Sequence, residues 1–156
     1  MEKIIKVIRN IQLTIGVFCL SIFFIAVLIQ IFTRYLGISV LWTEELTNYS
    51  FIWAVFMGAA VMVDFKEHFA FRGLHDKLKD PQKKRILQII IHSLIFVFSV
   101  YILILGIGIT KTFWNYKWIS LPQLQKGYIW LAVPIMGGTM SLYSFHNILQ
   151  EVKNKS

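Results

Sequence analysis

Charged residues divide this chain into four long stretches that contain none. No Asp, Glu, Lys or Arg occurs in residues 10–33, 46–63, 86–110 and 127–150, which are 24, 18, 25 and 24 residues long. A helix rises 1.5 Å per residue and the hydrocarbon core of a bilayer is about 30 Å thick, so each stretch is about long enough for one crossing. The pattern predicts an all-α membrane protein, with residues 1–156 as a single membrane domain of four transmembrane helices at these ranges.

Two flanking segments extend this pattern. Residues 1–10 place isoleucines at helical spacing and also carry Lys3, Lys6 and Arg9. They form either an amphipathic helix at the membrane interface or an extension of the first span, and the sequence leaves both open. Farther along, the Asp80-Pro81 step predicts the start of the third helix, because proline is tolerated in a first turn.

Composition excludes several classes of protein. Of 156 residues, 56% are hydrophobic and 15% charged, whereas soluble domains carry about 25% charged residues. A chain of this length with four spans has no room for a soluble catalytic domain. Its lone Cys19 excludes a disulfide framework and a cysteine-rich metal site. We therefore predict no catalytic residue, no metal and no cofactor.

The distribution of Lys and Arg predicts the orientation. Twelve of the 16 lie in the N-terminal segment, the 64–85 connection or the C-terminal end, and four lie elsewhere. Basic residues favour the cytoplasmic side, so we expect both termini and the 64–85 connection in the cytoplasm. The net charge of +8 then reflects topology and anionic lipids rather than nucleic-acid binding.

The charge-free stretches argue against an autonomous ion-coupled transporter. Such proteins place ionisable groups deep in the bilayer, whereas no acidic residue lies within a stretch here, and Glu44 and Glu45 stop at the outer entrance to the second one. We expect no buried charge in the bundle. A small haem-binding membrane anchor is the alternative function, because His92 and His146 fall at similar depth in antiparallel spans.

Small residues mark surfaces where helices can approach closely. Ser50, Ala54 and Gly58 follow at four-residue intervals in the second span, and Gly137 and Ser141 repeat the pattern in the fourth. Such stripes allow close helix packing in lipid. They either seal the bundle internally or receive a membrane partner.

Three stretches form a recognisable set. They are Arg34-Tyr35 with Leu41-Trp42-Thr43-Glu44-Glu45-Leu46; Phe56-Met57-Gly58-Ala59-Ala60 with Lys66-Glu67-His68; and Leu121-Pro122 through Tyr128-Ile129-Trp130 to Val133-Pro134-Ile135-Met136-Gly137. Together they resemble the small (Q-type, DctQ-like) membrane subunit of tripartite ATP-independent periplasmic (TRAP) transporters. One departure is residues 69–72, Phe-Ala-Phe-Arg, where relatives more often carry a Val-Asp pair.

The resemblance implies an accessory component rather than an enzyme. It implies a scaffold in the bacterial inner membrane, together with a large membrane subunit and a periplasmic substrate-binding protein. The large subunit would carry the substrate and sodium sites. The cargo would be an organic acid, such as a C4-dicarboxylate or a sialic acid.

The outer corner before the second span supplies the candidate interface residues Arg34, Trp42, Glu44 and Glu45. In the simpler interpretation, the carboxylates oppose a helix dipole and the Trp is an interfacial anchor. In the functional one, this corner meets the large subunit or the binding protein. Arg34 could pair with either carboxylate or hold a lipid phosphate.

Overall fold

The computed structural model describes residues 2–38, 40–65, 81–120 and 122–153, and helices dominate these ranges. Three segments are long and apolar enough to cross a membrane: Glu2–Tyr35, Leu41–Asp64 and Gln82–Phe113. The predicted all-α membrane class is confirmed, whereas a crossing by the fourth segment and the orientation stay predictions. The helices are α1 (Glu2–Tyr35), α2 (Leu41–Asp64), α4 (Pro81–Phe113), the single-turn α5 (Gly127–Trp130) and α6 (Ala132–Lys153).

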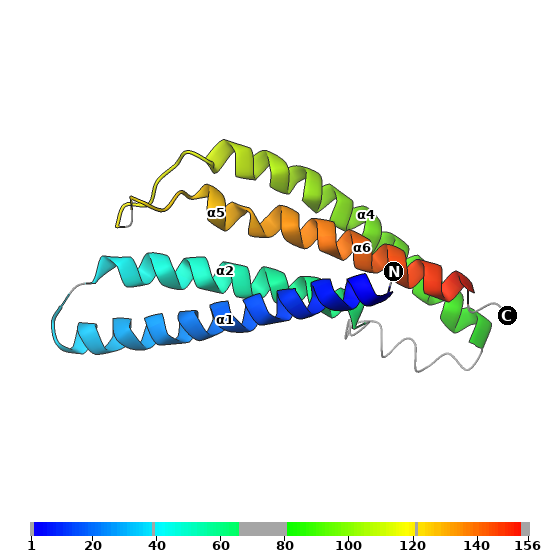
Figure 1. The fold of residues 1–156 in the computed structure, drawn as a ribbon, viewed down its shortest axis with the longest axis horizontal. Coiled ribbons are helices and arrows are strands. Elements are labelled where there is room, and N and C mark those ends of the chain that lie inside the picture. Colours follow the sequence, from blue (N-terminus) through cyan, green and yellow to red (C-terminus); the bar gives the residue numbers. More distant parts are fainter. Residues whose placement is uncertain (1, 39, 66–80, 121, 154–156) are drawn as a thin grey trace.

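The helices form two hairpins that lie side by side. Helix α1 packs on α2, α4 packs on α6, and the contact between α2 and α6 joins the hairpins. The order across the molecule is therefore α1, α2, α6, α4 (Figure 1). The start of α1 and the end of α6 lie at the same end of the molecule, as an even number of crossings requires (Figure 1).

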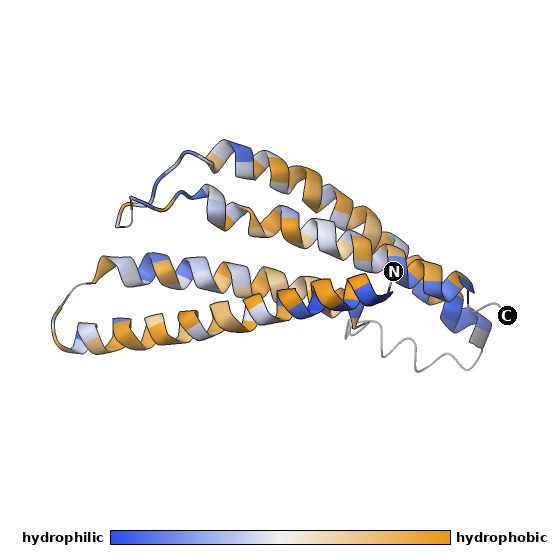
Figure 2. Ribbon diagram, viewed as in Figure 1, coloured by the Kyte–Doolittle hydropathy of each residue, from blue (hydrophilic) through white to orange (hydrophobic). Residues whose placement is uncertain are grey.

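This arrangement leaves much apolar surface uncovered. Only 6% of the most apolar 18-residue stretch of α1 is buried, against 28% for α2, which lies between two neighbours. Hydrophobic residues run along the outward sides of α1 and α4 (Figure 2). In water such faces would be costly, but lipid or a membrane partner can cover them.

Helices α1, α2, α4 and α6 each extend beyond a charge-free stretch. Helix α1 is continuous from Glu2, so the N-terminal segment extends the first span rather than forming a separate helix. Helix α4 begins at Pro81, as the Asp80-Pro81 step predicted. The helices can continue into charged residues because backbone hydrogen bonds, not apolar side chains, define them.

The predicted span 127–150 is divided at Leu131 rather than continuous. Pro134 has no N–H to donate to the carbonyl of Trp130, so one helical hydrogen bond is missing. The hydroxyl of Thr110, on α4, lies 3.0 Å from that carbonyl and 2.7 Å from the carbonyl of Gly106, so its one hydrogen can serve either acceptor. Leu131 keeps helical dihedral angles (φ −58°, ψ −26°), so the two helices continue in nearly one direction.

The core lies where α1, α2 and α6 meet. Ala60 and Val63 of α2 are fully buried there beside Tyr143 of α6, and Ile5 of α1 joins them. Between α4 and α6 the packing is closer still, because Gly137 lies against the backbone of Leu103. Small residues permit this approach, so the Gly137–Ser141 stripe seals the second hairpin.

Candidate functional site

The predicted outer corner is the turn between α1 and α2, and it is tightly built. Gly37 has a left-handed backbone (φ 71°). Its N–H donates to the Arg34 carbonyl at 3.1 Å, and the Ile38 N–H donates to the Thr33 carbonyl at 2.9 Å. This is a glycine-ended helix cap of the Schellman type. It fixes the position from which the Arg34 side chain leaves α1.

The turn does not bring all four corner residues together. Arg34, Trp42 and Glu44 are exposed, and Arg34 and Glu44 line the same open cavity of about 360 Å³. The two side chains form no ion pair with each other. The ion pair found within the described ranges is the one between Arg9 and Asp64. In this structure Arg34 pairs with neither carboxylate, so the charges of Arg34 and Glu44 are available to a ligand or partner.

Glu45 does not line this cavity, and its side chain instead links the two hairpins by hydrogen bonds. Its carboxylate accepts from the backbone N–H groups of Ile119 (3.0 Å) and Ser120 (3.1 Å) in the connection after α4. The same end of the molecule has a second link, from the indole N–H of Trp53 to the carbonyl of Tyr128 at 3.1 Å. Charge-assisted hydrogen bonds of this kind hold a loop in place. Glu45 therefore has a structural contact within the chain, unlike Glu44.

The stripe of Ser50, Ala54 and Gly58 is not a uniform contact surface. Ser50 is buried and its hydroxyl donates to the carbonyl of Leu46 at 2.7 Å. At Gly58, however, an added Cβ would meet nothing within 4 Å. The close approach between α1 and α2 instead lies at Gly16, whose Cβ would be 3.5 Å from that of Met57. A side chain added at Gly58 would thus point into open space, although α1 approaches the backbone of the stripe, where a Gly16 Cβ would lie 3.8 Å from the Ala54 carbonyl oxygen and 4.0 Å from the Gly58 nitrogen.

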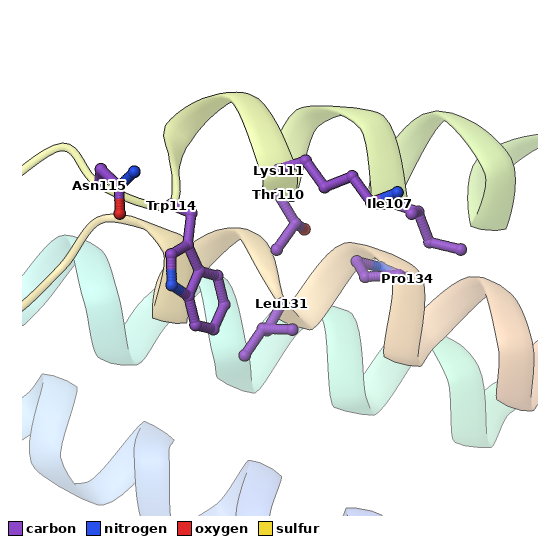
Figure 3. Close-up of a pocket in the computed structure, with 7 residues that line it drawn as sticks. All are labelled: Ile107, Thr110, Lys111, Trp114, Asn115, Leu131 and Pro134. Atoms are coloured by element: carbon purple, nitrogen blue, oxygen red, sulfur yellow. The ribbon is translucent and has the colours of Figure 1, made fainter.

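A second open cavity lies between α4 and the α5–α6 segment. It has a volume of about 460 Å³ and is mainly apolar, with Thr110, Trp114, Leu131 and Pro134 among its lining residues. Lys111 runs along α4 toward Ile107 at its rim (Figure 3). This cavity carries one cation and no acidic residue.

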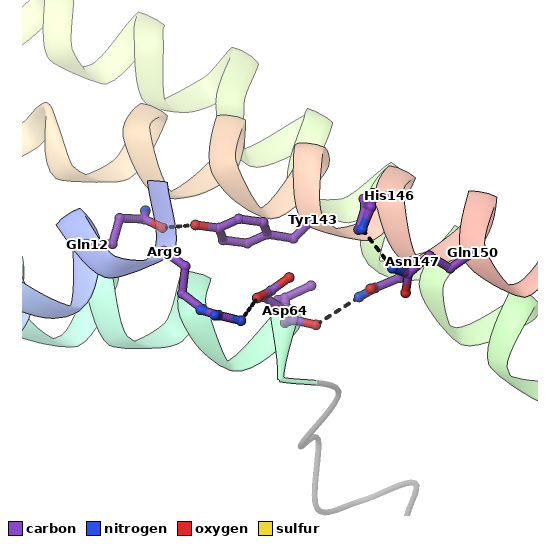
Figure 4. Close-up of polar contacts among 8 residues, drawn as sticks. Arg9, Gln12, Asp64, Tyr143, His146, Asn147 and Gln150 are labelled. Atoms are coloured by element: carbon purple, nitrogen blue, oxygen red, sulfur yellow. Dashed lines mark hydrogen bonds and ion pairs between the residues drawn. The ribbon is translucent and has the colours of Figure 1, made fainter. Parts of the chain in front are cut away.

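Sequence reasoning missed a polar cluster at the opposite end of the molecule. We call it the terminal polar cluster (Figure 4). It joins three helices: Arg9 of α1 forms an ion pair with Asp64 of α2 at 2.8 Å. The other contacts run from the Tyr143 hydroxyl to Gln12 Oε1 (2.5 Å), from Gln12 Nε2 to the Thr139 hydroxyl (2.8 Å) and from Asn147 Nδ2 to the Val63 carbonyl (3.1 Å).

The ion pair of this cluster lies at the ends of the first two charge-free stretches and not within them. The Asp64 side chain is only 7% exposed and that of Arg9 21%. Burial of a carboxylate requires a partner, and the guanidinium of Arg9 supplies it while also lying 5.1 Å from the ring centre of Phe65. The sequence did hold a signal: Tyr143, Asn147 and Gln150 recur at helical spacing on one face of α6.

The haem alternative gains no support. His146 lies on α6 with its Nε2 2.9 Å from the Gln150 side-chain nitrogen, and His92 is buried on α4. In the part of the chain that the structure describes, no three His, Cys, Asp or Glu side chains gather as metal ligands would. His68 and His75, like most of the 64–85 connection, lie outside the described residues.

Comparison with known proteins gives one family. The model of the family described as "Tripartite ATP-independent periplasmic transporters, DctQ component" matches residues 23–154. The match covers α2, α4, α5, α6 and the last part of α1. A comparison with curated proteins finds none that matches.

Proposed function

Because this chain belongs to the DctQ component family of tripartite ATP-independent periplasmic transporters, we propose that it is the small accessory subunit of a sodium-coupled organic-acid importer. It assembles in the bacterial inner membrane with a large membrane subunit, and a periplasmic binding protein delivers the substrate. The family match over residues 23–154 carries this proposal. The family is one of transporter components, not of enzymes.

The shape of the molecule supports a scaffolding role. Four helices in a row cover little of one another, and α1 is almost bare. A subunit of this form can widen the membrane anchor of a larger protein. The contacts of Tyr143 with Gln12 and of Asn147 with Val63 link the two hairpins at one end, and the Glu45 contacts link them at the other, as a fixed support requires.

We place the large-subunit contact on the face of α2 that carries Gly58. Its glycine is open, and the close approach of another helix is what a small residue permits in lipid. Gly58→Leu would add a branched side chain at that contact. Overpacking costs roughly 1–3 kcal/mol, so recovery of the complex should fall about tenfold or more, with the yield of the subunit itself unchanged.

Two matched variants separate the possible readings of this experiment. Gly108 of α4 is equally open, so Gly108→Leu should leave both the subunit and the complex intact. Gly137 is tightly packed against α4, so Gly137→Leu should reduce the folded subunit itself. Normal recovery of the complex with Gly58→Leu would show that this face of α2 meets lipid instead.

Dependence on partners is tested by reconstitution. Liposomes that contain this chain alone should show no sodium-driven uptake of a C4-dicarboxylate or a sialic acid. Uptake should require the large subunit and the binding protein together. Uptake by the chain alone would contradict the accessory role.

Orientation is tested with single cysteines at Lys79 and Gln123 in a Cys19→Ser background. With both termini in the cytoplasm, an impermeant thiol reagent added to intact cells should label position 123 and spare position 79. The reverse pattern would invert the topology.

A further inference from the structure

The turn between α1 and α2 presents a cation and an anion to one cavity without pairing them. Arg34 and Glu44 both line the 360 Å³ cavity. Both are exposed, and the ion pair found among the described residues involves neither. We propose that this cavity binds the zwitterionic headgroup of a phospholipid, with the phosphate at Arg34 and a primary ammonium group at Glu44.

The position in the fold suits a lipid headgroup. Arg34 follows the charge-free stretch 10–33 directly, and Glu44 comes two residues before the stretch 46–63. Both side chains therefore leave the helices at the level where hydrocarbon gives way to headgroups. The exposed apolar residues Phe32 (66%) and Leu41 (64%) flank them and can contact the acyl chains.

The cavity is held open by the backbone. The cap at Gly37 ends α1 sharply, and α2 begins at Leu41 after a short turn. The hydroxyl of Thr33, which also lines the cavity, donates back to the Ile29 carbonyl at 2.9 Å. Hydrogen bonds within α1 and at its cap thus fix the backbone on one side of the cavity.

The charges select the ligand. A guanidinium binds a phosphate through two parallel hydrogen bonds. A wholly anionic headgroup would meet the Glu44 carboxylate as well, and like charges at close range repel. A primary ammonium group removes that repulsion by donating hydrogen bonds to the carboxylate. A quaternary ammonium has no N–H to donate, so phosphatidylethanolamine should bind better than phosphatidylcholine.

Lipid retention by the purified full chain tests this site. Native mass spectrometry would compare phosphatidylethanolamine, phosphatidylglycerol and phosphatidylcholine with identical acyl chains. We expect the first to be retained about tenfold more than the other two, as the loss of one charge-assisted contact implies. Arg34→Gln should lower retention of phosphatidylethanolamine about tenfold. Glu44→Gln should abolish its preference over phosphatidylglycerol.

Lys111→Gln is the matched control, because Lys111 is an exposed cation at the other cavity. It should leave the lipid preference unchanged. Equal retention of the three lipids by the wild type would overturn the site. Unchanged retention of phosphatidylethanolamine by Arg34→Gln, or an unchanged preference in Glu44→Gln, would overturn it as well. The assay needs no large subunit and no transport, so its failure would leave the proposed transporter role untouched.

Discussion

Replacing Gly137 with alanine tests the close contact between α6 and the backbone of α4. A methyl carbon at this position would lie 2.7 Å from the backbone nitrogen of Leu103 and 2.9 Å from the carbonyl oxygen of Ser99. Both are backbone atoms of α4, which cannot swing aside as a side chain can. The alanine can be accommodated only if α4 and α6 move apart.

Two opposing terms set the size of the effect. Overpacking of this kind costs about 1–3 kcal/mol, and contact with a rigid backbone places Gly137→Ala toward the upper part of that range. Alanine also gains about 0.8–1 kcal/mol in helix propensity over glycine. We therefore expect a net loss of about 1–2 kcal/mol in the free energy of unfolding.

Neighbouring glycines provide the matched controls. At Gly138 a Cβ would lie 3.7 Å from the Leu103 side chain, an ordinary contact, and at Gly58 it would meet nothing within 4 Å. Gly138→Ala and Gly58→Ala should therefore be neutral or slightly stabilising. The assay is unfolding of the purified chain by SDS in mixed micelles, followed by circular dichroism. A Gly137→Ala variant as stable as Gly58→Ala would refute the packing argument.

Three further substitutions test contacts elsewhere in the chain. Asp64→Asn should lower the free energy of unfolding by about 1–3 kcal/mol in the same assay, because it leaves the half-buried Arg9 charge without its ion pair. Wild-type stability of this variant would mean that the ion pair contributes nothing. Gly37→Ala should cost about 1 kcal/mol because the backbone there is left-handed (φ 71°), and an unchanged midpoint would contradict that geometry. Thr110→Val should lower the free energy of unfolding by about 1 kcal/mol, because it removes the hydroxyl that can donate to the Trp130 carbonyl. The infrared absorption of that carbonyl should shift as well. Unchanged stability would mean that another donor serves the carbonyl.

Charge alone predicts where the helices lie but not most of their ends; the start of α4 at Pro81 is an exception, because a proline marks it. A charged residue shows where apolar side chains stop, and the backbone helix continues past it. Arg9 and Asp64 are an example. They bound the first and second stretches at the same end of two antiparallel helices, and so lie at the same depth. Equal depth allows the two residues to be neighbours, and the packing of α1 on α2 brings them within 2.8 Å.

The small-residue stripes show where sequence reasoning ends. Gly58 and Gly137 occupy equivalent places in similar patterns, each preceded or followed by a small residue four positions away. A Cβ added at Gly58 would meet nothing within 4 Å, whereas a Cβ added at Gly137 would lie 2.7 Å from the backbone nitrogen of Leu103. The difference arises from the rotation of each helix about its own axis, which is set by contacts between helices and not by the spacing of residues within one. A stripe predicts that close packing is possible on that face, and only the assembled helices decide whether the chain itself or a second protein provides the contact.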